Sequence, residues 1–188
     1  MGNSTPIEMA ENKKRIFDQT ASMHFKLSDE YKRMYTIEDA IEVISSIVLC
    51  GVTFLDCEKY FHIPAEASIL IIGFTSIFLL AFTLVKQGLN HKQLHEKYQL
   101  AGKMYAQAKL EIASQSVVWQ RVETSDTDIV EYINSHFTSL NDLPQIPEKH
   151  FNRLKHAHQY KVAFSKFLDS HQNDLWLACR IKFWLKKE

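Results

Sequence analysis

The most distinctive feature of the sequence is a long apolar segment without a charged residue. It covers residues 67–85, which are 19 positions in a row. With a rise of about 1.5 Å per residue, a helix over this segment is about 28 Å long, close to the roughly 30 Å of a bilayer's hydrocarbon core. Core helices of soluble proteins rarely lack charge over such a length. The pattern therefore predicts a membrane-spanning helix.

A second, shorter apolar run precedes it at residues 43–55. This run spans only if its helix extends back to Ile37 and forward to Cys57, with acidic residues near both ends and Tyr60 and Phe61 at the headgroups. The link at residues 62–65 is short, which favours a hairpin with spans near 37–57 and 67–85. The alternative is that the first run forms a helix lying against the membrane surface.

Basic residues flank the two apolar runs asymmetrically. Those on the outer sides of the hairpin are Lys13, Lys14, Arg15, Lys26, Lys32, Arg33, Lys86, Lys92, Lys97 and Lys103. The link between the runs has only Lys59. The positive-inside rule then predicts a multi-pass membrane protein with both termini in the cytoplasm and the turn at Pro64 outside.

The residues before the hairpin predict an N-terminal cytoplasmic amphipathic helix over residues 1–36. Thr5 and Glu8 form a capping box, with Pro6 at the first helical position. Thr36 and Asp39 resemble a second cap, so we expect the helix to end near Tyr35 and the hairpin, residues 37–86, to begin after a bend.

The segment after the hairpin, residues 87–122, contains no proline and predicts one long helix leaving the membrane. Its apolar positions recur at spacings of three and four, which is the pattern of a packing seam. The seam consists of Leu94, Tyr98, Ala101, Tyr105, Ala108 and Ile112. Its partner is either the N-terminal helix or a neighbouring subunit.

The C-terminal region, residues 123–188, also predicts helices. Ser125 should cap the first, an extended connector at residues 143–147 should end at Pro147, and the next helix should start there. Asn173 and Asp174 should cap the last, whose Trp176, Phe183 and Trp184 fit a packed helix better than an interfacial one. The expected fold class is all-α, a membrane protein with a two-helix transmembrane hairpin and a cytoplasmic helical bundle.

Composition narrows the function. Of the 188 residues, 22 are Lys or Arg and 22 are Asp or Glu, and a net charge of zero argues against direct nucleic-acid binding. The three cysteines, Cys50, Cys57 and Cys179, exclude a disulfide scaffold, and Cys179 should be buried and inert. No catalytic or phosphate-binding motif is present, so we expect no enzyme and no cofactor. His91 and His95 have a zinc-ligand spacing but no third ligand, and a solvated face explains them better.

Two groups of residues are candidate sites. Lys149, Arg153, Lys155, His156 and His158 form a basic patch that could bind an anion, although most such runs are solvated helix faces. On the first span, mildly polar positions recur at spacings of three and four: Glu42, Ser46, Cys50, Thr53 and Cys57. In an oligomer this polar stripe could line a conduit, with Glu42 forming an acidic ring. Alternatively, its small residues let helices pack closely.

This layout resembles the SLATT proteins, two-transmembrane effectors of prokaryotic conflict systems. The resemblance covers nearly the whole chain and rests on the helix at 13–35, the two spans and the 98–105 stretch of the exiting helix. It implies an antiviral defence role, in which the protein perforates the inner membrane when infection is sensed. It also implies neighbouring genes for nucleotide second-messenger synthases, nucleotide-sensing domains or reverse transcriptases.

Two functional hypotheses remain. The first is a pore-forming effector of an anti-phage abortive-infection system, which homo-oligomerises in the lipid bilayer when a nucleotide second messenger or a co-encoded sensor protein signals. The second is a non-conducting membrane adaptor that localises a cytosolic partner. An adaptor has no need of the polar stripe, and that difference separates the two.

Overall fold

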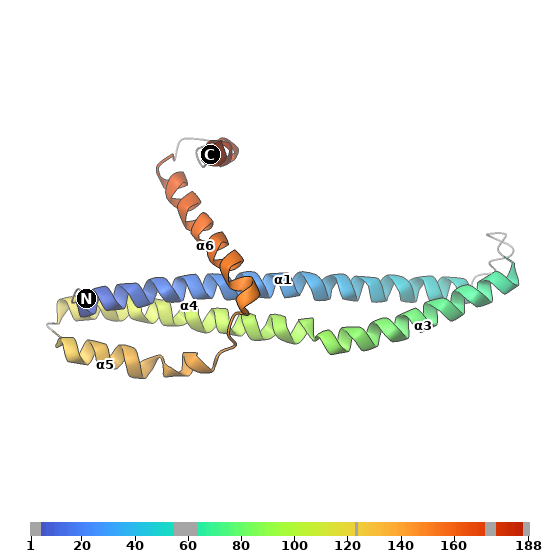
Figure 1. The fold of residues 1–188 in the computed structure, drawn as a ribbon, viewed down its shortest axis with the longest axis horizontal. Helices are drawn as coiled ribbons and strands as arrows, with labels where there is room; N and C mark the ends of the chain where they lie inside the picture. Colours follow the sequence, from blue (N-terminus) through green and yellow to red (C-terminus); the bar gives the residue numbers. More distant parts are fainter. Residues whose placement is uncertain (1–4, 55–63, 123, 172–175, 186–188) are drawn as a thin grey trace. The chain divides into compact units, whose positions relative to one another are not determined.

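The computed structural model describes residues 5–54, 64–122, 124–171 and 176–185. Within these ranges the fold is all-α, as expected, with no strand. The elements are α1 (Pro6–Phe54), α3 (Ala65–Leu89), α4 (His91–Arg121), α5 (Asp126–His136), the short 3-10 helix η1 (Thr138–Asp142), α6 (Glu148–Asp169) and α7 (Trp176–Leu185) (Figure 1).

The chain divides into two compact units. The first comprises Met1–Leu27 and Tyr98–Glu188, and the second comprises Ser28–Lys97. Helices α1 and α4 each contribute one part to each unit.

The start of α1 confirms the predicted capping box. The Thr5 backbone N–H donates to Glu8 Oε2 at 3.0 Å, and the Glu8 N–H donates to Thr5 Oγ1 at 3.3 Å. The predicted bend near residue 36 is wrong, because α1 continues as helix to Phe54. The Thr36 hydroxyl donates to the carbonyl of Lys32 at 2.8 Å. A threonine that bonds back to the preceding turn in this way does not cap a new helix.

The long helix predicted over residues 87–122 is present as α4, but its continuity with the second apolar helix is wrong, because Asn90 separates α3 from α4. Asn90 has φ 50° and ψ 34°, and its N–H donates to the carbonyl of Lys86 at 3.3 Å. Asparagine tolerates this left-handed conformation better than most residues and closes helices in this way. The absence of proline therefore did not guarantee continuity.

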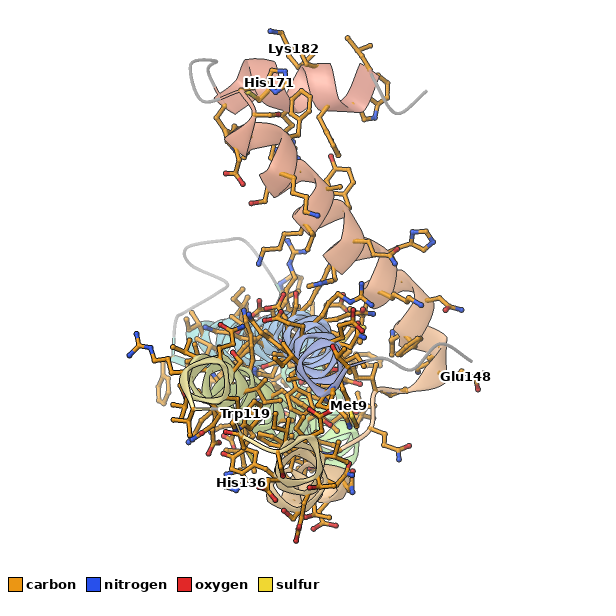
Figure 2. The ribbon with its side chains drawn as sticks, turned by 90° about the vertical axis from the view of Figure 1, so that its left-hand side faces the viewer. Met9, Trp119, His136, Glu148, His171 and Lys182 are labelled. Atoms are coloured by element: carbon orange, nitrogen blue, oxygen red, sulfur yellow. The ribbon has the colours of Figure 1, made fainter. Side chains whose placement is uncertain are left out.

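The core of the first unit lies between α1, α4 and α5. Figure 2 looks nearly along these helices and labels Trp119, which belongs to α4. Phe17 of α1 packs its ring against Phe137 at 5.3 Å and against Tyr105 at 5.8 Å between ring centroids. The buried cluster is Ala10, Phe17, Ala108, Ile112, Trp119, Ile129, Ile133, Phe137 and Leu140.

Close approach of α1 and α4 is visible at Gly102. A Cβ atom built on Gly102 would lie 2.9 Å from Cδ1 of Phe25, so the glycine makes room for this ring. Small residues on α4, including Ala101 and Ala108, are buried along the same side. The partner of this part of the seam is thus the N-terminal helix of the same chain.

The C-terminal elements follow the predicted signals in part. Ser125 Oγ accepts from the Asp128 N–H at 3.3 Å and caps α5, and α6 begins directly after Pro147. Phe183 of α7 packs against Tyr160, Phe164 and Phe167 of α6, with centroids 5.3–5.4 Å apart. Cys179 is buried as expected, whereas Trp176 and Trp184 are 51% and 61% exposed. Asn173 and Asp174 lie outside the described residues.

His24 is a polar residue inside the first unit. Its ring is 2% exposed and stacks between Tyr98 and Tyr105, at 5.7 and 5.4 Å between centroids. Desolvation by burial lowers the pKa of His24 from 6.5 to about 4. The imidazole is therefore neutral at pH 7.

We expect His24 to make the protein less stable in acid. An unfolded histidine takes up its proton near pH 6.5 and the folded one near pH 4, so protonation favours the unfolded chain between these values. The free energy of unfolding should fall as pH drops through this window, by up to about 3 kcal/mol, and should not change through this group above it. Thermal melting in detergent across this pH range measures the effect.

The comparison that isolates His24 is His24→Phe, which keeps a ring between the two tyrosines. It should flatten the pH dependence between 6.5 and 4, whereas His136→Phe, at an exposed histidine, should not. An equally steep decline in His24→Phe would show that other groups cause it.

The contribution of the α4 seam to stability can be measured with two aliphatic side chains of equal size, one buried and one exposed. Ile112 is 0% exposed and Leu110 is 68% exposed. Ile112→Ala should lower the free energy of unfolding by about 2–5 kcal/mol because it leaves a cavity. Leu110→Ala should change it by less than about 0.5 kcal/mol. Melting curves of the two variants in detergent check this, and equal losses would contradict the observed packing.

Candidate functional site

The second unit exposes a large apolar surface on α3. Its exposed large side chains are Ile69, Leu70, Ile71, Phe74, Ile77, Phe78, Leu80, Leu84, Val85 and Leu89. In the described part of the chain, one helical stretch, Glu66–Arg121, is long and apolar enough to cross a membrane, and its apolar window is not buried inside the protein. Soluble monomers rarely expose apolar patches of this size.

The end of α1 exposes a similar but shorter apolar surface. Its exposed members are Ile37, Ile41, Val43, Ile44, Ile47, Val48 and Phe54. The described part of this helix ends at Phe54, and Glu38, Asp39 and Glu42 interrupt its apolar character at the other end. The described part of this helix is not long and apolar enough to count as a membrane-spanning helix. The first span therefore stays a prediction.

Within this unit α1 and α3 lie side by side (Figure 1). Half-buried positions recur on both helices at spacings of three and four. On α1 they include Glu42, Ser45, Leu49 and Val52, and on α3 they include Ile72, Thr75, Leu79, Phe82 and Lys86. This is the pattern of one packing seam between two antiparallel helices. Their other faces remain open.

An ion-pair cluster joins the two helices at one end of this seam. Lys86 Nζ of α3 lies 2.6 Å from Asp39 Oδ1 and 2.5 Å from Glu42 Oε2 of α1. The Thr83 hydroxyl donates to Glu42 Oε1 at 3.3 Å. One cation thus bridges two carboxylates on the facing helix, and this geometry fixes the register of α1 against α3.

Two histidines of α4 extend this polar junction along α1. His91 Nδ1 lies 2.6 Å from Glu38 Oε1, and the His91 ring stacks on Tyr31. His95 Nδ1 lies 2.7 Å from Ser28 Oγ and 3.0 Å from the Ser28 carbonyl. The two histidines therefore engage different partners. No group of three potential metal ligands lies together among the described residues.

The ion pairs and His91 surround a pocket of about 440 Å³, whose lining includes Tyr35, Glu38, Glu42, Lys86 and His91. It holds both signs of charge within hydrogen-bond distance of each other. Such a lining stabilises contacts between the helices.

The polar stripe predicted on the first span divides into two parts. Glu42 turns toward Lys86, whereas Ser46, Cys50 and Thr53 are exposed. The Ser46 and Thr53 hydroxyls donate to the carbonyls four residues earlier, at 2.8 and 2.7 Å. Cys57 lies outside the described residues.

A shallow groove brings part of this stripe together. It is lined by Asp39, Glu42, Val43, Ser46, Ile47, Cys50 and Gly51, all on α1. Thr53 is not part of the lining. The structure therefore gathers three stripe residues on one accessible surface and leaves the carboxylate of Glu42 already paired.

The predicted seam and the predicted anion patch have different environments. Tyr98, Ala101, Ala108 and Ile112 are buried, and Leu94 and Tyr105 are half-buried. In the patch, Lys149, Arg153, Lys155 and His156 are exposed on α6. His158 is separate from them, since it is half-buried and its Nε2 lies 4.0 Å from Asp18 Oδ2. The patch is thus four exposed residues of α6, of which Lys149, Arg153 and His156 lie on one face of the helix.

Sequence reasoning missed the role of Lys86, which it treated only as a topology signal. The signal was present, because Lys86 directly follows one apolar run while Asp39 and Glu42 directly precede the other. In an antiparallel hairpin these positions lie at the same level. His24 was missed as well, although it stands between Met23 and Phe25, because a histidine alone does not indicate burial.

Comparisons with known proteins add no constraint: no family model, no curated protein and no solved structure matches this chain.

The ion-pair cluster predicts a specific pattern of stabilities. Lys86→Met leaves Asp39 and Glu42 without their shared cation and should lower the free energy of unfolding by about 1–3 kcal/mol. Adding Asp39→Asn and Glu42→Gln to Lys86→Met should restore most of this loss, because no unpaired charge remains. Melting in detergent measures both, and Lys92→Met, at an exposed position on α4, is the control.

If Lys86→Met and Lys92→Met melt alike, the cluster does not contribute measurably to stability. If the triple variant is no more stable than Lys86→Met, the loss comes from packing of the lysine stem and not from unpaired carboxylates.

Proposed function

We propose that this protein is a two-span effector of a bacterial inner membrane in an anti-phage abortive-infection system. Both termini lie in the cytoplasm. When a nucleotide-type or partner-protein signal is sensed, copies of the chain assemble and permeabilise the membrane. The observation that carries this proposal is a single surface of α1 on which small polar side chains lie among exposed apolar ones.

The apolar surfaces of α1 and α3 support membrane insertion. Both helices leave their outer faces uncovered, and lipid is an environment that covers apolar side chains without a specific partner. Lys86, Asp39 and Glu42 then lie at the cytoplasmic edge of the bilayer, where charged groups reach water and headgroups.

The groove on α1 supports assembly into a conduit. Ser46 and Cys50 lie in it next to Val43 and Ile47, and Gly51 leaves room for another helix. Small residues allow close helix contacts in membranes, and hydroxyl and thiol groups tolerate water better than aliphatic side chains. Neighbouring copies that turn these grooves inward form a narrow, mildly polar pathway.

The pairing of Glu42 with Lys86 changes the expected acidic ring. Asp39 and Glu42 share the one cation of Lys86, at 2.6 and 2.5 Å, so the mouth of the conduit carries about one net negative charge per copy instead of two. The conduit we propose is therefore lined by Ser46, Cys50 and Thr53, with the ion pairs at its cytoplasmic end.

One observation favours the alternative, a non-conducting membrane adaptor that localises a cytosolic partner. The Ser46 and Thr53 hydroxyls already donate to carbonyls of their own helix. Hydroxyls satisfied in this way tolerate lipid or a packed helix and do not need a water-filled path.

Membrane depolarisation distinguishes the two functions. Cells that make the unaltered protein, with its neighbouring genes and a phage challenge, should lose membrane potential, admit dye and stop growing. Ser46→Leu and Thr53→Leu should insert at the same level but depolarise much less, because an apolar constriction loses water. Val48→Leu, which places the same leucine side chain at an exposed apolar position, is the control and should depolarise normally.

Three results would overturn this proposal. Full depolarisation by Ser46→Leu and Thr53→Leu would show that α1 does not line the conduit. Unchanged potential in cells making the unaltered protein would favour the adaptor. A C-terminal reporter active in the periplasm would contradict the two-span layout.

A further inference from the structure

The first unit contains a pocket that has no part in the proposed membrane activity. Its volume is about 530 Å³, within the range of small-molecule sites. The walls come from α1, α4, the end of η1, the connector before α6 and the first turn of α6. The polar and aromatic residues of the lining are Thr20, His24, Tyr105, Asn141, Gln145 and Phe151.

His24 is the unusual member of this lining. It is 2% exposed, and its Nδ1 is buried without a hydrogen-bond partner among the described residues. Buried polar atoms are nearly always satisfied, and an exception calls for a partner that the chain does not supply. The stacking of its ring between Tyr98 and Tyr105 holds the imidazole in place.

The remaining lining defines the chemistry of an occupant. No Asp, Glu, Lys or Arg lines the pocket as described. The amides of Asn141 and Gln145 and the hydroxyl of Thr20 offer both donors and acceptors. Tyr105 and Phe151 supply aromatic surface. A neutral molecule with polar atoms around a flat ring fits these groups, whereas a phosphate would find no cation there.

We propose that this pocket binds an uncharged planar heteroaromatic ring of the nucleobase type, with His24 as its buried hydrogen-bond partner. The ring edge supplies N–H and C=O groups to His24, Asn141 and Gln145. This site is independent of the proposed membrane activity, because all of its residues belong to the first unit.

Binding at the exposed patch on α6 would differ from binding in the pocket in its dependence on phosphate. If Lys149, Arg153 and Lys155 were the main binding site, affinity would depend on phosphate and not on the ring. For the pocket, a nucleoside and its 5′-monophosphate should bind with affinities within about threefold of each other, and inorganic phosphate should not compete.

Titration calorimetry on the full chain in detergent tests the proposal. The probes are adenosine, guanosine, cytidine and uridine, their 5′-monophosphates, and inorganic phosphate. At least one nucleoside should bind. His24→Phe should weaken its binding at least tenfold, on the order of the loss of one buried hydrogen bond. His136→Phe, which changes an exposed histidine outside the lining, should bind as the unaltered protein does.

If His24→Phe fails to fold, Gln145→Ala serves as the second variant. Gln145 is exposed, so this substitution does not alter the packed core. This variant should fold normally and bind several-fold more weakly. The proposal is overturned if none of the four nucleosides binds, if inorganic phosphate displaces the nucleoside, or if folded His24→Phe and Gln145→Ala bind as tightly as the unaltered protein.

Discussion

The second unit depends on covering the apolar surface of α3. Ten large apolar side chains of this helix are exposed in the described structure. Transfer of such a side chain from water to an apolar environment is favourable by up to about 1.5–3 kcal/mol, so covering all ten is favourable by at most roughly 15–30 kcal/mol. An apolar environment therefore favours this surface strongly over water. The packing seam against α1 covers only one side of the helix.

The ion-pair cluster follows from that constraint. Once α3 and the end of α1 lie in an apolar environment, unpaired carboxylates beside them become expensive. Lys86 lies within 2.6 Å of both Asp39 and Glu42 and, from the facing helix, reduces their combined charge from −2 to −1. The same contacts set which turns of α1 and α3 are neighbours. Partial charge neutralisation and helix register are thus one feature of the molecule.

The sequence allowed prediction of features that depend on neighbouring residues and missed those that depend on helix pairing. Thr5 and Ser125 capped helices as expected, because a cap is made by the residues beside it. Thr36 and Asn90 were misjudged, since threonine can bond to the preceding turn and asparagine can end a helix without proline. The partners of Lys86 and the burial of His24 needed the register of α1 against α3 and α4. A single sequence does not supply that register.

The pairing of Glu42 also limits what a conduit along α1 would be. A ring of free carboxylates attracts cations, but here Asp39 and Glu42 share one ammonium group, so each copy keeps about one negative charge instead of two. The other lining groups, Ser46, Cys50 and Thr53, are neutral. Along that neutral part, passage would depend on width and wetting, because hydroxyl and thiol groups hold water weakly between the aliphatic neighbours Val43 and Ile47. A weakly selective conduit is sufficient for depolarisation, since collapse of the membrane potential requires the passage of ions and no discrimination among them.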